Sequence, residues 1–342
     1  MTKLIVQVPC LNEADQLPDL VRHLPRQVDG FDQVEWLVID DGSTDGTVDV
    51  ARSVGFHHIV RLPVHKGLAI AFQTGLDAAL KLGADVIVNT DADGQYDGSD
   101  IARLVKPLLQ GEADMAVGDR GVSSAEGFNW TKRRLQTLGS WVVSRASGTK
   151  VPDATSGFRA YNRDAALQLV VVTAFTYTLE TLIQAGASSV TVANVPIARH
   201  HVERPSRLFT SNWDYIKKSI GGISRIYAFY RPLRVFTTAS AVLALAGLAA
   251  WSPFLISWVE GNPHGHIQSI ILGAVLIIAA VQIFALGIVA DLMAKQRVLS
   301  QFTLERVRRL EVHTGTPPSH YEPGGPPAVR DPAAPDIGPP TS

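Results

Sequence analysis

Short apolar runs alternate with amphipathic stretches through the first two hundred residues of the chain. The apolar runs predict buried strands at Leu4–Val8, Glu35–Ile39, His58–Leu62, Asp85–Asn89, Met115–Val117 and Val190–Val195. Apolar positions at helical spacing predict helices at Ala14–Leu24, Thr47–Val54, Leu68–Leu82 and Asp100–Gln110. This alternation is typical of an α/β fold in which helices cover a mostly parallel sheet.

Two longer apolar runs follow. Residues 235–259 and 261–290 contain no Asp, Glu, Lys or Arg, and each exceeds the roughly 20 residues that cross a bilayer core. They predict transmembrane helices at 233–259 and 267–291; a hairpin buried in a soluble core is the alternative. Lys and Arg flank the pair, whereas the connection Glu260–His266 has neither. The positive-inside rule therefore predicts a cell-membrane protein, plasma or inner, with both termini cytoplasmic.

The remaining segments divide the chain further. Residues 1–208 hold the α/β pattern, and 209–232 mix aromatic, Ile and basic residues, which predicts an amphipathic segment at the inner membrane surface. Residues 292–314 predict a basic cytoplasmic helix. Residues 315–342 are rich in Pro and Gly, which predicts a disordered tail.

Composition adds only a few limits. The chain has 342 residues, of which 46% are hydrophobic and 18% charged, and its net charge is −1. No basic stripe or known module indicates binding to nucleic acid. The single cysteine, Cys10, cannot form a disulfide within the chain. The N-terminus lacks the apolar segment and cleavage site of a secretory signal.

Two carboxylates one residue apart follow the apolar run at 84–89. Residues i and i+2 of an extended segment point to the same side, so Asp91 and Asp93 can converge beyond the end of a strand, where open α/β sheets bind ligands. Oxygen ligands of this kind suit Mg²⁺ or Mn²⁺, which in turn holds phosphates. The alternative is an acidic turn that ends at Gly94.

Polar residues also follow the first two predicted strands. Asn12 can cap the next helix, with Glu13 in its first turn. Asp40 and Asp41 end the second strand. A turn explains the Gly, Ser and Asp that come after them, but it does not explain two adjacent carboxylates.

These motifs, taken in order, resemble the family 2 glycosyltransferases, which have the GT-A fold. The motifs that carry the resemblance are Pro9–Glu13, Asp40–Thr47, His65–Ala69 and Asp91–Gln95. Three further stretches resemble the polyprenyl-phosphate branch, which includes dolichyl-phosphate mannose synthases and bacterial undecaprenyl-phosphate glucosyltransferases. They are Gly118–Arg120, Asn129–Thr137 and Asp153–Arg159. The resemblance spans residues 3 to about 300, because bacterial members also end in a two-helix membrane hairpin.

The resemblance implies a donor site for a nucleotide sugar of the GDP-mannose or UDP-glucose type. Its residues are Pro9, Leu11, Asn12, Glu13, Asp40, Asp41, Lys66, Asp91, Ala92 and Asp93. Of these, Asp91 and Asp93, together with Gln95, would hold Mg²⁺ or Mn²⁺. Members of the branch also form homo-oligomers, which extends to this chain as an expectation.

The residues that would bind the acceptor can be predicted from charge, because a lipid phosphate needs cationic hydrogen-bond donors in a fork-like arrangement. The candidates are Arg120, Arg133, Arg134 and Arg159, although each alone could be a surface charge. Asp153 would orient the acceptor or an arginine, and Asp93 completes the catalytic set. Because a phosphate oxygen is already ionised, a dedicated base is less necessary than for a hydroxyl acceptor. The expected reaction is an inverting, metal-dependent transfer of a sugar to a polyprenyl monophosphate at the cytoplasmic face of the bilayer.

Three other functions remain open at this point. A polysaccharide synthase usually has a Gln-x-x-Arg-Trp motif and more membrane spans, and the sequence has neither. A glycolipid synthase acting on diacylglycerol would need a base for its hydroxyl acceptor, which leaves the arginines less explained. A catalytically silent membrane scaffold would not require the Asp91 and Asp93 pair.

Overall fold

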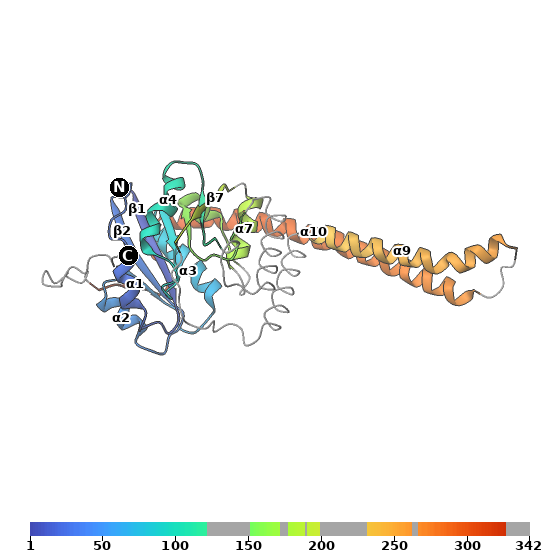
Figure 1. Cartoon of the computed structure of the whole chain (residues 1–342), viewed down its shortest axis with the longest axis horizontal. Coiled ribbons are helices and arrows are strands. Elements are labelled where there is room, and N and C mark those ends of the chain that lie inside the picture. Colours follow the sequence, from blue (N-terminus) through green and yellow to red (C-terminus); the bar gives the residue numbers. More distant parts are fainter. Residues whose placement is uncertain (122–150, 172–176, 189, 199–230, 262–265, 326–342) are drawn as a thin grey trace. The chain divides into compact units, whose positions relative to one another are not determined.

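The computed structural model describes residues 1–121, 151–171, 177–188, 190–198, 231–261 and 266–325 (Figure 1). The chain divides into two compact units. One consists of Met1–Leu208 with Glu305–Ser342, and the other of Phe209–Leu304.

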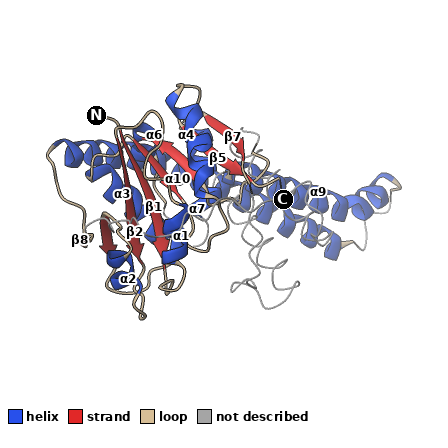
Figure 2. Cartoon of the chain, turned by 60° about the vertical axis from the view of Figure 1, so that its left-hand side comes forward, coloured by secondary structure: helices blue, strands red, loops and turns tan. Residues whose placement is uncertain are grey.

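The first unit is built on an eight-stranded sheet within the described residues (Figure 2). Its strands are β1 (Lys3–Cys10), β2 (Gln33–Asp40), β3 (His58–Arg61), β4 (Val86–Asn89), β5 (Met115–Asp119), β6 (Arg159–Asn162), β7 (Val192–Pro196) and β8 (Tyr321–Pro323). Their order is β7-β5-β6-β4-β1-β2-β3-β8. Strands β4, β1, β2 and β3 run parallel to one another, as do β5 and β7. This arrangement confirms the predicted α/β fold with its mostly parallel sheet.

Helices cover both faces of this sheet. They are α1 (Leu17–His23), α2 (Thr47–Ser53), α3 (Leu68–Lys81), α4 (Ile101–Leu109), α6 (Arg163–Gln168) and α7 (Tyr177–Ala187), with a short 3₁₀ turn at Gly98–Asp100. Alternate β1 residues, including Leu4 and Val6, join one core with α1 and α4. On the opposite face Gly75 of α3 lies so close to Gln7 that an added Cβ would be 2.6 Å from the Gln7 side chain. Because β1 is buried on both faces, it needs the nearly continuous apolar run seen in the sequence.

The sequence patterns missed β6, α6 and α7. Strand β6 is four residues long, starts with an arginine and pairs antiparallel with both β4 and β5. A short strand with a charged first residue carries almost no period-2 signal, so its place in the sheet comes from its neighbours.

The prediction of a disordered tail at residues 315–342 is wrong for the first part of that segment. Tyr321–Pro323 forms β8 and pairs antiparallel with β3, with Glu322 opposite Ile59. The composition rule weighs the apolar area that a segment can bury, whereas this segment is held mainly by backbone hydrogen bonds to an exposed strand edge. Residues 326–342 lie outside the described residues.

The second unit contains two helices that are long and apolar enough to cross a membrane, α9 (Pro232–Val259) and most of α10 (Ile267–His313). They pack on each other through small residues and two hydrogen bonds. Ser240 Oγ donates to Ala280 O (2.8 Å), and Trp251 Nε1 donates to Ile270 O (3.0 Å). A Cβ on Gly273 would lie 2.8 Å from Gly247 O, so glycine permits this close approach.

Residues 292–313 of the predicted basic helix are helical and continue α10 without a break after the second predicted span. Lys and Arg are good helix formers, so a change from apolar to basic residues need not end a helix. The predicted amphipathic segment, 209–232, falls almost wholly outside the described residues, and the orientation of the spans stays a prediction.

Within the first unit, the last turns of α10 pack against the α/β fold. Arg308 Nη1 donates to Leu169 O at 2.7 Å. Glu311 forms an ion pair with Lys81 of α3 (3.1 Å), and Arg309 forms one with Asp164 of α6 (2.9 Å). These contacts make residues 305–313 part of the α/β unit, in agreement with its division from the helical pair.

Trp36 on β2 offers a test of the core beneath the site. Its ring is fully buried, packs edge-to-face on Phe56 at 6.0 Å, and donates from Nε1 to Pro25 O at 3.1 Å. We expect Trp36→Ala to lower the free energy of unfolding by about 3–5 kcal/mol, because it leaves a large cavity. Denaturant titration in detergent measures this. Trp36→Phe keeps most of the buried ring and should lose clearly less; equal losses for the two variants would contradict the packing role.

Candidate active site

The carboxyl ends of β1, β2 and β4 meet at one edge of the sheet. The register sets Cys10 of β1 opposite Asp40 of β2, and Gln7 of β1 opposite Asn89 of β4. The loops that leave these strands carry most of the predicted site residues. This is the edge at which open α/β sheets bind their ligands.

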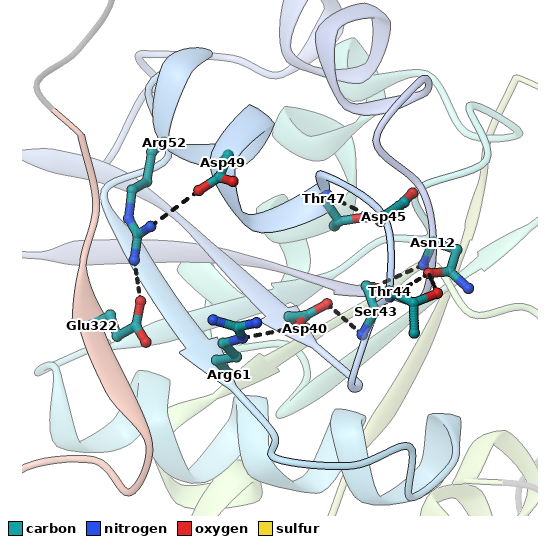
Figure 3. A network of polar contacts seen from close by, with 10 residues as sticks. All are labelled: Asn12, Asp40, Ser43, Thr44, Asp45, Thr47, Asp49, Arg52, Arg61 and Glu322. Atoms are coloured by element: carbon teal, nitrogen blue, oxygen red, sulfur yellow. Dashed lines mark hydrogen bonds and ion pairs between the residues drawn. The ribbon is translucent and has the colours of Figure 1, made fainter.

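The loops after β1 and β2 are joined by hydrogen bonds (Figure 3). Asn12 N donates to Ser43 Oγ (2.9 Å), and Thr44 N donates to Asn12 Oδ1 (2.8 Å). Asn12 has a φ of 54°, a left-handed conformation that asparagine tolerates better than most residues. The predicted helix cap at Asn12 is therefore wrong, since α1 begins only at Leu17 and Asn12 instead fastens two loops together.

The backbone at Glu13 belongs to the same junction. Glu13 N donates to Thr47 Oγ1 at 3.0 Å, and Ala14 N donates to Asp45 Oδ2 at 3.2 Å. Ser43 and Asp45, which a turn seemed to explain, and Thr47, which was given no role of its own, were missed as residues that shape the site. Pro9 is buried and Leu11 partly buried beside them.

The adjacent carboxylates Asp40 and Asp41 have different surroundings. Asp41 accepts hydrogen bonds from Lys66 N (2.7 Å) and Gly67 N (2.9 Å) and pairs with His65 Nδ1 (2.8 Å). It therefore anchors the 65–67 loop, and it leaves the Lys66 side chain exposed. The pairing with His65 was not predicted.

Asp40 keeps one oxygen open. Its side chain is fully buried, and Oδ1 accepts from Ser43 N at 3.2 Å. Oδ2 has no hydrogen-bond partner among the described residues, and the nearest cation, Arg61 Nε, lies 3.9 Å away. A buried acceptor of this kind is costly unless a ligand completes it.

Asp91 and Asp93 follow β4 as predicted. Burial and the charge of Asp93 raise the pKa of Asp91 to about 7, although Arg120 and Arg159 act in the opposite direction. Asp93 Oδ1 accepts from Gln95 N at 3.0 Å, and Ala92 between the two carboxylates is buried in the core. Burial, the larger cause, and the neighbouring Asp93 charge both disfavour the ionised form of Asp91.

A glycine fixes the backbone behind Asp91. Gly157 O accepts from Asn89 Nδ2 (2.9 Å), and Gly157 N donates to Tyr96 Oη (3.1 Å). A Cβ at Gly157 would lie 2.8 Å from both Asp91 Oδ2 and Tyr177 Oη. Sequence reasoning missed this support, although an asparagine within an apolar strand is a signal for a buried polar contact.

Arg120 and Asp153 form a bidentate pair. Arg120 Nε and Nη2 donate to the two Asp153 oxygens at 2.7 and 2.9 Å, and Nη2 also donates to Thr155 Oγ1 at 3.0 Å. Burial alone would raise the pKa of Asp153, but the bonds from Arg120 hold it below its usual value. Of the two roles predicted for Asp153, the structure supports the orientation of an arginine.

Arg159 was predicted to contact the acceptor phosphate, and the structure contradicts that role. The side chain is fully buried. It donates to four oxygens of the surrounding loop and of α7, which are Ser156 O, Ala154 O, Thr178 O and Thr181 Oγ1. With its donors used in this way, Arg159 holds the 154–156 loop in place. Arg133 and Arg134 lie outside the described residues.

Asp91 and Asp93 fit a divalent cation, because a bound cation would stabilise the ionised form of Asp91, which burial and the Asp93 charge disfavour. Among the described residues no group of three or more His, Cys, Asp or Glu side chains could hold a metal. Mg²⁺ is often bound by one or two carboxylates with water and substrate phosphates as its other ligands. Gln95 Oε1 accepts from Arg120 Nη1 at 3.4 Å, and its place as a third ligand stays a prediction.

Comparison with known proteins agrees with this arrangement. The chain matches glycosyl transferase family 2 over residues 5–169 and the GtrB C-terminal hairpin over residues 231–295. A polyprenol monophosphomannose synthase of Mycolicibacterium smegmatis is 33% identical over 175 residues, which cover 47% of this chain and 62% of that protein. An undecaprenyl-phosphate mannosyltransferase of Micrococcus luteus is 30% identical over 168 residues, which cover 47% of this chain and 67% of that protein.

A solved structure shares the fold. Glucosyl-3-phosphoglycerate synthase from Mycobacterium tuberculosis, crystallised with uridine diphosphate, matches with a TM-score of 0.50 and 23% identity. The match covers 65% of this chain and 80% of that chain, and it shows the fold alone. The α/β fold and its site define this protein as a glycosyltransferase. The chain belongs to glycosyl transferase family 2, and it carries the two-helix hairpin after the catalytic unit.

The pKa of Asp91 gives a pH test of the carboxylate pair. The pKa of Asp91 in the folded protein, about 7, lies above its ordinary value of 3.8, so folding favours the protonated form, and a cation must displace that proton. We expect affinity for Mn²⁺ to weaken about tenfold per pH unit below 7 and to level off above that pH. Calorimetric titration from pH 5.5 to 8.5 measures this. In Asp93→Asn the midpoint should move to lower pH, and an unmoved midpoint would contradict the coupling.

Gly157→Ala tests the backbone support of Asp91. The new Cβ would press on Asp91 Oδ2 and Tyr177 Oη, so we expect Mn²⁺ affinity to fall about tenfold. The control is Gly111→Ala, at a φ of 70° with open space around it, which should cost about 1 kcal/mol of stability and leave Mn²⁺ affinity unchanged. Equal Mn²⁺ affinities in the two variants would show that Gly157 does not position Asp91.

Proposed function

We propose that this glycosyltransferase moves a sugar from a nucleotide-sugar donor of the GDP-mannose or UDP-glucose type to the phosphate of a polyprenyl monophosphate. The two relatives named above, a polyprenol monophosphomannose synthase and an undecaprenyl-phosphate mannosyltransferase, support this acceptor class. The matched hairpin and its two apolar helices support a site that works beside a bilayer. The Lys and Arg residues that flank the two helices favour cytoplasmic termini.

The observation that carries the proposal is the fixed arginine beside the carboxylate pair. Arg120 is held by Asp153 and reaches Gln95, two residues beyond Asp93, and its charge partly offsets the rise in the pKa of Asp91 that burial and Asp93 cause. An acceptor with a phosphate headgroup needs a fork-like cation close to the donor diphosphate. A rigid bidentate pair keeps that cation in one orientation without the entropy cost of ordering a free side chain.

The proposed reaction is one in-line displacement. An acceptor phosphate oxygen forms a bond to the anomeric carbon as the bond from that carbon to the donor diphosphate breaks, which inverts the carbon. The leaving nucleoside diphosphate keeps the electron pair. No general base is required, because a phosphate monoester has its second pKa near 6 and is largely ionised at neutral pH.

Different residues of this chain would bind the nucleoside, the cation and the acceptor phosphate. Asp40 and the loops joined by Asn12 would receive the nucleoside, and Asp41 holds the loop that carries Lys66 beside it. Asp91 and Asp93 would hold a divalent cation, which when bound neutralises the charge that develops on the diphosphate. Arg120 would orient the acceptor phosphate, and Arg159 acts only by holding the loop that bears Asp153 and Thr155.

A hydroxyl acceptor, as in a glycolipid synthase, is less well supported. Asp153 is a carboxylate beside the acceptor arginine, but its pKa is lowered and both its oxygens are engaged by Arg120. Such a carboxylate is a weak general base.

The direct test is transfer in proteoliposomes, with polyprenyl phosphate, a panel of labelled nucleotide sugars, and Mg²⁺ or Mn²⁺ present or absent. A metal-dependent, organic-extractable and mild-acid-labile product from one donor would support the proposal and identify the sugar. Product formed only with diacylglycerol, or a polymer, would replace it with one of the other synthases. The absence of any transfer and of nucleotide binding would favour a silent scaffold.

Two variants separate donor chemistry from acceptor binding in the same assay. We expect Asp93→Ala to abolish transfer while the protein still inserts into membranes, and Asp153→Asn to raise the KM for polyprenyl phosphate about tenfold or more because Arg120 loses its charged partner. Asp19→Asn removes an exposed carboxylate and serves as the control. Full turnover in Asp93→Ala, or an unchanged acceptor KM in Asp153→Asn, would remove the corresponding role.

A further inference from the structure

The segment after α10 returns to the catalytic unit and completes its sheet. Strand β8 lies along β3, with Tyr321 opposite Val60 and Pro323 opposite His58. Arg61 N donates to His320 O at 3.0 Å, and Gly324 N donates to His57 O at 3.0 Å. Without β8, the four residues of β3 would be the edge of the sheet, with unpaired backbone groups along one side.

The side chains of this segment fit β3 and α2 closely. The Tyr321 hydroxyl and His58 Nδ1 are 3.0 Å apart, and Glu322 forms an ion pair with Arg52 of α2. A Cβ on Gly324 would overlap the Phe56 carbonyl oxygen, and one on Gly325 would overlap that of Arg52. Only glycine permits this approach at either position, so the docking depends on these particular residues.

Strand β8 pairs with β3, and β3 ends beside the site that we propose binds the donor. Arg61 ends β3, and the Arg61 backbone N–H makes the hydrogen bond to His320. The Arg61 side chain brings Nε to 3.9 Å from Asp40 Oδ2, the buried oxygen that lacks a hydrogen-bond partner among the described residues. Leu62 N donates to Asp40 O at 2.8 Å. Figure 3 shows the pairs Glu322–Arg52 and Arg61–Asp40 together with the loop contacts of Asn12 and Ser43.

We propose that residues 320–325, here named the clasp, position Arg61 beside Asp40, so that the donor-binding half of the site is complete only with the clasp docked. The identity of the donor rests on the proposed function, whereas the docking of the clasp does not. A four-residue strand at a free edge opens easily, and its last residue, Arg61, would lose the backbone hydrogen bond to His320 of the clasp. The clasp therefore acts on the donor side of the reaction and leaves the Arg120 and Asp153 pair untouched.

The first experiment compares two truncations of the full chain in detergent. Ending the chain after Gly315 removes the clasp, and ending it after Gly325 keeps the clasp and removes only residues 326–342. Hydrogen exchange of peptides covering residues 57–62 should rise in the first truncation and stay at the level of the full chain in the second. This readout needs no enzymatic activity. Unchanged exchange after loss of the clasp would overturn the proposed docking.

The kinetic prediction concerns the donor alone. Loss of the clasp should raise the donor KM, and the Kd for the nucleoside diphosphate product, about tenfold, with the KM for polyprenyl phosphate within about twofold of the full chain. A structural defect of the whole unit would instead raise both KM values and lower kcat together. Increased exchange at 57–62 with an unchanged donor KM and Kd would overturn the positioning role.

Point variants test the same contacts without a truncation. Gly324→Ala should reproduce the loss of the clasp, because its Cβ cannot fit against Phe56, and Ser319→Ala in the same segment is the control. Glu322→Arg should weaken docking, and the double swap with Arg52→Glu should restore much of it. Failure of the swap to recover any protection at 57–62 would count against the ion pair.

The outcomes keep this proposal separate from the proposed function. If the full chain transfers no sugar to polyprenyl phosphate, the reaction proposed above fails. The exchange data and the Kd for uridine or guanosine diphosphate would still decide whether the clasp positions the donor site.

Discussion

Several carboxylates lie close together at one edge of the sheet, and most of the hydrogen bonds and ion pairs at that edge stabilise them. Asp40, Asp41, Asp91 and Asp93 end or follow strands whose carboxyl ends meet at that edge. Asp41 accepts hydrogen bonds from backbone N–H groups and pairs with His65, and Asp153 nearby forms an ion pair with Arg120. Burial and the nearby Asp93 charge raise the pKa of Asp91 to about 7, and Arg120 and Arg159 offset this only in part. A divalent cation bound there would supply the positive charge that this carboxylate pair lacks.

The same crowding explains why so much buried polar structure lies behind the site. The Asp91 and Asp93 carboxylates can bind one ligand together only if their positions are fixed. The Gly157 backbone, which bonds to Asn89 and Tyr96, supports the segment behind Asp91. Arg159 secures the neighbouring loop from within the core. Buried polar groups with all their bonds made are costly to disturb, so they fix geometry better than apolar packing alone. Arg159 thus holds the loop that bears Asp153 and Thr155 from within the core.

The sequence was most informative where pattern and chemistry coincide. The strand that ends at Asn89 and the carboxylates after it could be placed from a β-branched run and the i, i+2 rule, because both depend only on local geometry. The functions of Arg159 and Asn12 could not, because a charged or amide side chain takes its partners from distant segments. From the sequence alone, Arg159 is interpreted as a surface cation, because its burial follows from the position of β6 inside the sheet. Likewise, the loop contact made by Asn12 requires the register of β1 against β2.

The tail illustrates a different limit of sequence reasoning. Pro and Gly lower the apolar area that a segment can bury, which is why residues 315–342 were expected to be disordered. Yet the two glycines at 324 and 325 are what allows the chain to approach the backbone at 52–57, where Gly324 N donates to His57 O after Pro323 ends the strand. A composition that argues against an independent fold is thus compatible with a strand added to an existing edge, because the sheet already provides the partner groups. Since α10 ends against α3 and α6 before this strand begins, the docked residues 305–313 limit the loss of chain entropy when β8 forms. The end of the second apolar helix and the completion of the donor edge are in this sense one structural feature.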